Sequence, residues 1–144
     1  MTMSKWQRIE ATIRGEAVDR TPLSMWVHYH LQDRGPQRLA ESTYRLYREF
    51  DLDLLKLTPS GLYSVQDWGA AIRYSRHDWV APVMNEPVIR SAADWFELGE
   101  LDVNQGALER ELEMIHAVKQ RVGDEAPILM TIFSPLTLAW KLLG

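Results

Sequence analysis

The chain has 144 residues, of which 46% are hydrophobic and 25% charged, the balance of a globular domain rather than a disordered or fibrous chain. Its formal net charge of -4 gives no electrostatic reason to expect nucleic acid or an anionic membrane as a partner, since both attract basic surfaces. The lack of cysteine excludes disulfides and thiolate metal sites, and no apolar signal segment opens the sequence, which favours a cytoplasmic protein. No apolar run approaches the roughly 20 residues that span a bilayer.

The first predicted elements are a short helix and a strand. Ser4 followed by Gln7 resembles a capping box, and the apolar spacing that follows predicts an amphipathic helix that stops at Gly15. Residues 23–29 are apolar on both faces, as in a parallel strand that is covered by helices. Core packing is therefore expected for Trp26 in this strand.

A second helix and strand follow directly. Proline in the pair Gly35-Pro36 is typical of a first helical turn, and the helix is predicted to end near Asp51. Residues 52–58 form the second predicted strand, which a turn at 59–61 closes. This alternation of strand and helix predicts an α/β fold with parallel strands.

The middle of the chain is less regular. Residues 61–88 are interpreted as a short hairpin or an excursion over the mouth of a barrel. Ser91 with Asp94 predicts another helical turn, which includes Leu98 and leads to Leu101.

The last third repeats the helix and strand pattern. A long helix is predicted to close at Gly123, and residues 127–133 form the third predicted strand. Ser134-Pro135 then provides an N-cap and first turn for a helix from Leu136. The apolar stripe of the long helix is predicted at Leu108, Leu112, Ile115, Val118 and Val122.

Two segments carry a resemblance to a known family. Residues 8–22, with a charged turn at Glu16, Asp19 and Arg20, and residues 133–139 resemble the amino-terminal part of uroporphyrinogen decarboxylase family proteins. The resemblance implies that residues 1–144 are a partial domain, the amino-terminal portion of a (β/α)8 TIM barrel with about three parallel strands. It further implies a lyase without metal or organic cofactor that removes carboxylates from a tetrapyrrole in porphyrin biosynthesis. The charged turn lies at the amino end of the first strand. Residues on that face of a barrel are expected to stabilise the fold rather than to take part in catalysis.

The sequence departs from the family pattern at two places. Residues 27–31 stand where family enzymes carry an Arg-Gln-Ala-Gly-Arg-like segment that holds substrate carboxylates, and both arginines are absent. Ser60 stands where the family places an aspartate aimed at the pyrrole N–H groups. A divergent member, inactive as a decarboxylase in this fragment, is therefore predicted.

Two further functions stay open. A related branch of the superfamily resembles corrinoid-linked methyltransferases, whose zinc site is formed by histidine and cysteine residues later in the barrel than this sequence reaches. Alternatively, the chain is a non-catalytic half-barrel that forms a homo-oligomer through an unpaired strand edge. Such an interface is predicted to bury Ile128, Met130, Ile132, Leu138 and Trp140.

Candidate substrate-binding residues follow the first two predicted strands. His28 and His30 alternate on one strand and therefore point the same way, which favours contact with a carboxylate or tetrapyrrole substrate over a metal. Ser60, Tyr63 and Gln66 offer neutral hydrogen bonds after the second strand. Hydrogen bonding to loop backbone remains an alternative for the histidines, as does a plain turn for Ser60. No catalytic residue and no metal ligand is assigned.

Overall fold

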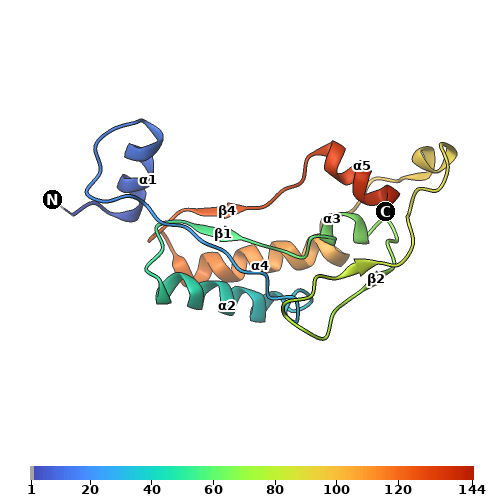
Figure 1. The fold of residues 1–144 in the computed structure, drawn as a ribbon, viewed down its shortest axis with the longest axis horizontal. Helices are drawn as coiled ribbons and strands as arrows, with labels where there is room; N and C mark the ends of the chain where they lie inside the picture. Colours follow the sequence, from blue (N-terminus) through green and yellow to red (C-terminus); the bar gives the residue numbers. More distant parts are fainter. Residues whose placement is uncertain (1) are drawn as a thin grey trace.

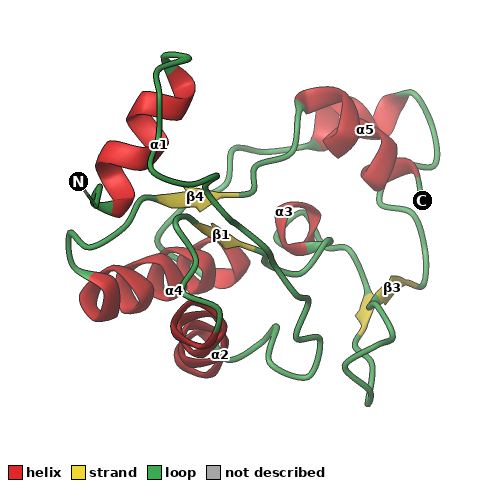
Figure 2. Cartoon of the chain, turned by 60° about the vertical axis from the view of Figure 1, so that its left-hand side comes forward, coloured by secondary structure: helices red, strands yellow, loops and turns green. Residues whose placement is uncertain are grey.

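The computed structural model describes residues 2–144, and two parallel strands with two helices beside them form its centre (Figure 1). β1 (Leu55–Leu57) pairs in parallel with β4 (Ile128–Met130). The helices α2 (Pro36–Glu49) and α4 (Gly106–Val122) pack against each other on one side of this pair (Figure 2). The predicted α/β fold with parallel strands is confirmed, although both strands are shorter than 52–58 and 127–133.

The main core lies between the two strands and the two helices. Its members are apolar residues that reach it from α2, from β1 and its approach, and from α4, so each element contributes one face. Burial of this face, rather than intrinsic helix propensity, provides most of the helical stability. The buried core residues are Leu39, Ala40, Tyr47, Leu52, Leu55, Leu57, Met114, Ala117, Val118, Val122 and Ala126.

Two of the helices begin at the caps that the sequence indicates. α1 (Lys5–Ile13) has the reciprocal capping box, since the Ser4 hydroxyl accepts from the Gln7 N–H and the Gln7 side chain accepts from the Ser4 N–H. α5 (Pro135–Leu143) begins after Ser134, whose hydroxyl accepts from the Thr137 N–H at 3.2 Å. Both predicted N-termini are therefore confirmed.

Residues 23–29 are extended but are not a strand, which corrects the first predicted strand. The Asp53 N–H donates to the Leu23 carbonyl at 2.8 Å, but the next contact runs from the Ser24 hydroxyl to the Leu54 carbonyl at 3.0 Å. After one backbone hydrogen bond, the next contact is thus made by a side chain, and no regular parallel pairing follows. The segment still lies beside β1, as the sequence order predicts (Figure 1).

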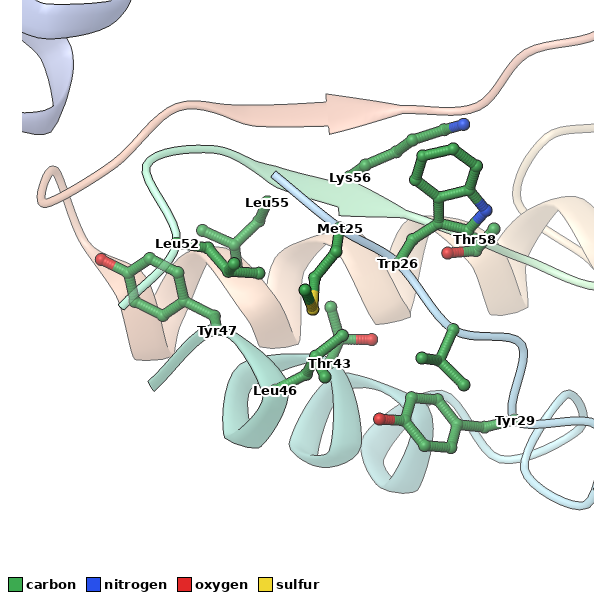
Figure 3. A pocket seen from close by; sticks show the side chains of 11 residues that line it. Met25, Trp26, Tyr29, Thr43, Leu46, Tyr47, Leu52, Leu55, Lys56 and Thr58 are labelled. Atoms are coloured by element: carbon green, nitrogen blue, oxygen red, sulfur yellow. The ribbon is translucent and has the colours of Figure 1, made fainter. Parts of the chain in front are cut away.

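Met25 and Tyr29 of this extended segment pack against the main core, while Leu23, Trp26 and Val27 are exposed. Met25 points toward α2, while Trp26 lies on the other side under the Lys56 ammonium, 3.6 Å from the ring centroid (Figure 3). Trp26 is 50% exposed, so the expectation that it packs in the core is wrong. The cavity that remains beside Met25 has a volume of about 10 Å³, enough for one water molecule at most.

The irregular middle of the chain contains a small hairpin, as one of the two interpretations predicts. β2 (Ile72–Arg73) pairs antiparallel with β3 (Val83–Met84). It follows α3 (Tyr63–Gln66) and precedes a 3₁₀ helix, η1 (Ala93–Glu97), whose start is fixed by bonds from Ser91 to Asp94. A second, smaller core joins this region to α5 through Val65, Ala70, Ile89 and Leu142.

The buried face of α4 differs from the predicted stripe by about one residue. Leu112, predicted in the core, is 40% exposed, and Glu111 beside it is buried. The helix packs against both α2 and α3, and this two-sided contact selects its buried face. The residues that α4 buries are Ala107, Glu111, Met114, Ala117, Val118 and Val122.

An ion-pair network surrounds Asp53 at the amino end of β1. The Asp53 carboxylate accepts from Arg8 Nη1 at 2.6 Å, from both Nη atoms of Arg20 at 2.5 and 2.9 Å, and from the Leu23 N–H at 2.8 Å. Arg8 also binds Asp19, and that contact holds the pKa of Asp19 well below its usual range. The charged turn is thus structural, as its position predicts.

Within the described residues 2–144, no helix is both long enough and apolar enough to cross a membrane.

Candidate functional site

A pocket of about 270 Å³ lies beyond the carboxyl end of β1. It is formed where the end of the extended segment, the turn after β1, the hairpin and α5 meet. Its volume is slightly below the range typical of pockets for drug-sized ligands, so it suits a small molecule. The residues that line it are His28, His30, Gly61, Leu62, Ala81, Pro82 and Lys141.

The two histidines of the pocket stack on each other. The rings of His28 and His30 are 5.1 Å apart, with 12° between their planes. Burial lowers the pKa of His28, and the electrostatic influence of His30 and Lys56 lowers it further, against the opposing effect of Asp33. The lowered pKa favours the neutral form of His28, whose ring provides a flat wall of the pocket.

His30 is held by a buried carboxylate. Its Nδ1 lies 3.2 Å from Asp33 Oδ2, and the Asp33 side chain is fully buried. Burial raises the pKa of Asp33, although the hydrogen bond from His30 acts in the opposite direction. The second carboxylate oxygen, Oδ1, has no hydrogen-bond partner among residues 2–144.

Among the described residues, Lys141 brings the only ammonium group to the lining of this pocket. Its Nζ lies over the ring of Phe133, 4.5 Å from the centroid, and near that of Trp140 at 5.8 Å. No carboxylate in the described part of the chain pairs with it, and burial lowers the pKa of Lys141. An ammonium that has lost water without gaining an anion attracts a negatively charged ligand.

Gln66 belongs to a polar network outside the pocket lining. Its Oε1 accepts from the Tyr74 hydroxyl at 2.8 Å and from Arg110 Nη2 at 3.3 Å. Arg110 also contacts Glu111 Oε1 at 3.2 Å. Burial raises the pKa of Glu111 to about 7, with Asp33 adding to the shift and Arg110 opposing it.

The other two predicted contacts use their polar atoms within the fold. The buried Ser60 hydroxyl accepts from the Leu62 N–H at 3.4 Å, as in a turn. The Tyr63 hydroxyl donates to the Thr131 carbonyl at 3.2 Å, which ties α3 to the end of β4. The structure therefore brings His28 and His30 together at the pocket, and places Ser60, Tyr63 and Gln66 outside the lining.

Sequence reasoning missed Asp33, Lys141 and Glu111. The spacing of three residues between His30 and Asp33 was one available signal, because it places both in one turn of the chain. Glu111 lies three residues after Leu108, on an apolar stripe, and a charged residue there indicates an unusual environment. Lys141 gave no such signal, since a lysine near the end of a helix is ordinary. In the described residues, no three histidine, aspartate or glutamate side chains gather closely enough to hold a metal ion.

Comparison with family models gives a match over residues 4–144 to the family described as uroporphyrinogen decarboxylase (URO-D). The chain belongs to the uroporphyrinogen decarboxylase family. No curated protein matched the chain in the corresponding search.

Solved structures similar to this family member include a methyltransferase from Methanosarcina mazei. The two share 19% sequence identity with a TM-score of 0.72, so the likeness concerns the fold. The match covers 99% of this chain and 46% of the methyltransferase chain, so this chain spans slightly less than half the length of that structure.

Proposed function

We propose that the chain forms the amino-terminal part of a (β/α)8 barrel, and that its carboxyl-end pocket binds a small ligand bearing a carboxylate. Membership of the uroporphyrinogen decarboxylase family and the parallel pairing of β1 with β4 support the barrel. Barrel enzymes bind their ligands at the carboxyl ends of the strands, which is where the pocket lies.

The single observation that supports a carboxylate ligand is the position of Lys141. Its ammonium group is partly buried in the pocket lining beside Phe133, and it pairs with no carboxylate of residues 2–144. An arriving carboxylate would form a charge-assisted hydrogen bond there, about twice as strong as a neutral one. The stacked histidines add a flat surface on another wall.

Decarboxylation is the reaction that gives the family its name, and a tetrapyrrole or a smaller carboxylate is the corresponding substrate. The pocket contains one lysine in place of the two arginines of the family segment, so it suits a ligand with fewer carboxylates than a full tetrapyrrole. Incubation of the chain with uroporphyrinogen is expected to give turnover well below about 1 per second, a rate ordinary for enzymes. Faster loss of carboxylate would refute this.

Corrinoid-linked methyl transfer is the second candidate. The methyltransferase from Methanosarcina mazei supports it, because its fold matches nearly the whole chain. An assay with a methylated corrinoid as donor separates the two reactions, since only methyl transfer consumes the methyl group. Both reactions use the same strand-end pocket.

A binding measurement tests the proposal directly. Propionate should shift the resonances of Lys141 and His30 in an NMR titration, while propionamide, of equal size but uncharged, should not. Replacing Lys141→Ala should weaken propionate binding about tenfold, which corresponds to one charge-assisted hydrogen bond. Arg45→Ala removes one positive charge from the exposed face of α2 and should leave the affinity unchanged. Equal binding of both compounds would contradict the carboxylate pocket.

Self-association is proposed for the face formed by β4 and α5. Ile132 and Leu136 are each 80% exposed and Trp140 is 66% exposed, so large apolar side chains gather there. Sedimentation at micromolar concentration should show a dimer or larger species. A monomer that unfolds cooperatively, and whose Trp140 fluorescence does not change with protein concentration, would refute self-association.

A further inference from the structure

The ring of His30 has one nitrogen engaged and one free. Nδ1 lies 3.2 Å from Asp33 Oδ2, and no partner for Nε2 exists within the part of the chain that the structure describes. The His30 side chain is 10% exposed, and the residue lines the 270 Å³ pocket. The free nitrogen is therefore the one available to a bound ligand.

An ionised carboxylate can accept a hydrogen bond but cannot donate one. The hydrogen bond between ionised Asp33 and a neutral His30 therefore requires the imidazole proton to be on Nδ1. We infer that Asp33 is a positioning residue: it fixes His30 as the Nδ1–H tautomer and presents Nε2 to the pocket as a hydrogen-bond acceptor. The inference rests on the proposed function for its ligand, but the tautomer itself is a property of the free protein.

The surroundings of Asp33 distinguish this role from a purely structural one. A structural buried carboxylate satisfies both oxygens, as the four donors around Asp53 do. Asp33 instead makes one side-chain bond, to His30, while Oδ1 lacks a partner in residues 2–144. Its burial is thus coupled to the orientation of one imidazole ring.

The charged groups around the pair do not take over this role. Arg110 influences Asp33 electrostatically, but its hydrogen bonds go to Gln66 and Glu111. His28 stacks on the face of His30 and makes no hydrogen bond to it. Asp33 is therefore the group that sets the tautomer.

The ligand class follows from this arrangement. Lys141 favours a carboxylate, and Nε2 of His30 accepts a hydrogen bond, so the matching ligand carries a donor such as a hydroxyl or N–H group beside its carboxylate. A carboxylic acid without such a donor leaves Nε2 unpaired inside the pocket. The site should therefore prefer a hydroxy acid to its deoxygenated analogue.

The first test measures the tautomer in the absence of any ligand. Long-range ¹H–¹⁵N spectra of the imidazole rings distinguish Nδ1–H from Nε2–H, and we expect Nδ1–H for His30 in the wild-type chain. Asp33→Asn should introduce the Nε2–H form, because the side-chain amide can donate to Nδ1. Asp78→Asn is the matched control. Asp78 Oδ1 accepts from the N–H of Leu31, the residue that follows His30, and no hydrogen bond joins Asp78 to the His30 ring. An Nε2–H tautomer in the wild type overturns the inference, and this measurement needs no variant to fold.

The second test compares lactate with propionate by NMR titration. One neutral hydrogen bond to the lactate hydroxyl corresponds to about a threefold to tenfold preference for lactate over propionate in the wild type. Equal affinities in the wild type would overturn the ligand class. If neither acid binds, the proposed carboxylate pocket fails, while the tautomer measurement still decides the role of Asp33.

Discussion

Two buried aspartates near opposite ends of β1 have opposite environments. Asp53 receives four hydrogen bonds from Arg8, Arg20 and the Leu23 N–H. Burial alone would raise the pKa of Asp53, but these donors outweigh it and lower the pKa. Asp33 has a single bond to His30, and burial raises its pKa.

The difference separates a site that stabilises the fold from one that is available for chemistry. The donors around Asp53 join α1, the charged turn and the approach to β1, so that network holds chain segments together. Asp33 and Glu111, by contrast, each have one buried carboxyl oxygen that lacks a hydrogen-bond partner within the described residues. Buried titratable groups with perturbed pKa values are typical of functional sites.

The largest effect is expected from Asp53→Asn. The substitution leaves the guanidinium of Arg8 and that of Arg20 without their shared anion, and the free energy of unfolding should fall by about 3 kcal/mol. Urea denaturation at pH 7 measures it. Because the folded pKa of Asp53 lies below its unfolded value, this stabilisation is present above about pH 4 and is lost as the pH falls.

The matched control at this end is Asp51→Asn. Asp51 pairs with Lys5 and Arg20 but its side chain is 77% exposed, so the loss should stay below about 0.5 kcal/mol. Asparagine also tolerates the positive φ of 44° at this position. Equal losses for the two variants would show that the Asp53 network has no special role.

Glu111→Gln should have the opposite sign and depend on pH. The pKa of Glu111 rises from 4.5 to about 7 on folding, so the folded state retains a proton that the unfolded state has lost between these values. Stability therefore falls as the pH rises from about 4.5 to about 7, and stays reduced above. The glutamine variant escapes this loss and should be more stable at pH 8 by up to about 3 kcal/mol, since one unit of pKa shift corresponds to about 1.4 kcal/mol.

At pH 5 the same substitution should change the free energy of unfolding little, because Glu111 is then protonated in the folded state. Paired urea titrations at pH 5 and pH 8 provide the measurement. Glu113→Gln, on the exposed face of α4, should have little effect at either pH. Destabilisation by Glu111→Gln at pH 8 would mean that the ionised carboxylate is well satisfied by Arg110.

Apart from the control variants, the smallest effect is expected from Arg20→Lys. Lysine retains the positive charge but cannot bind both oxygens of Asp53 at once, as the two Nη atoms of Arg20 do. A loss of about 1 kcal/mol in the free energy of unfolding should result, since one hydrogen bond to a charged group is removed and the residue is partly exposed. A loss as large as that of Asp53→Asn would show that the bidentate geometry of Arg20, rather than its charge, provides the stabilisation.

The sequence could predict the features that depend on neighbours in the chain. The caps at Ser4 and Ser134 and the α/β order follow from local hydrogen bonding and hydrophobic spacing, and all three are observed. His28 and His30 were likewise predicted as candidates from their alternation at a predicted strand end, and they line the pocket together. That prediction of substrate contact remains to be tested.

Tertiary structure decided what depends on distant segments. Whether residues 23–29 join a ladder rests on each backbone bond to β1, and one hydroxyl at Ser24 replaces the second of them. The buried face of α4 is set by its contacts with α2 and α3, which place Glu111 inside and Leu112 partly outside. Periodicity fixes which residues share a helix face, but only packing selects the face that is buried. The meeting of Lys141 with His30 has the same origin, because more than a hundred positions of chain separate two side chains that line one pocket.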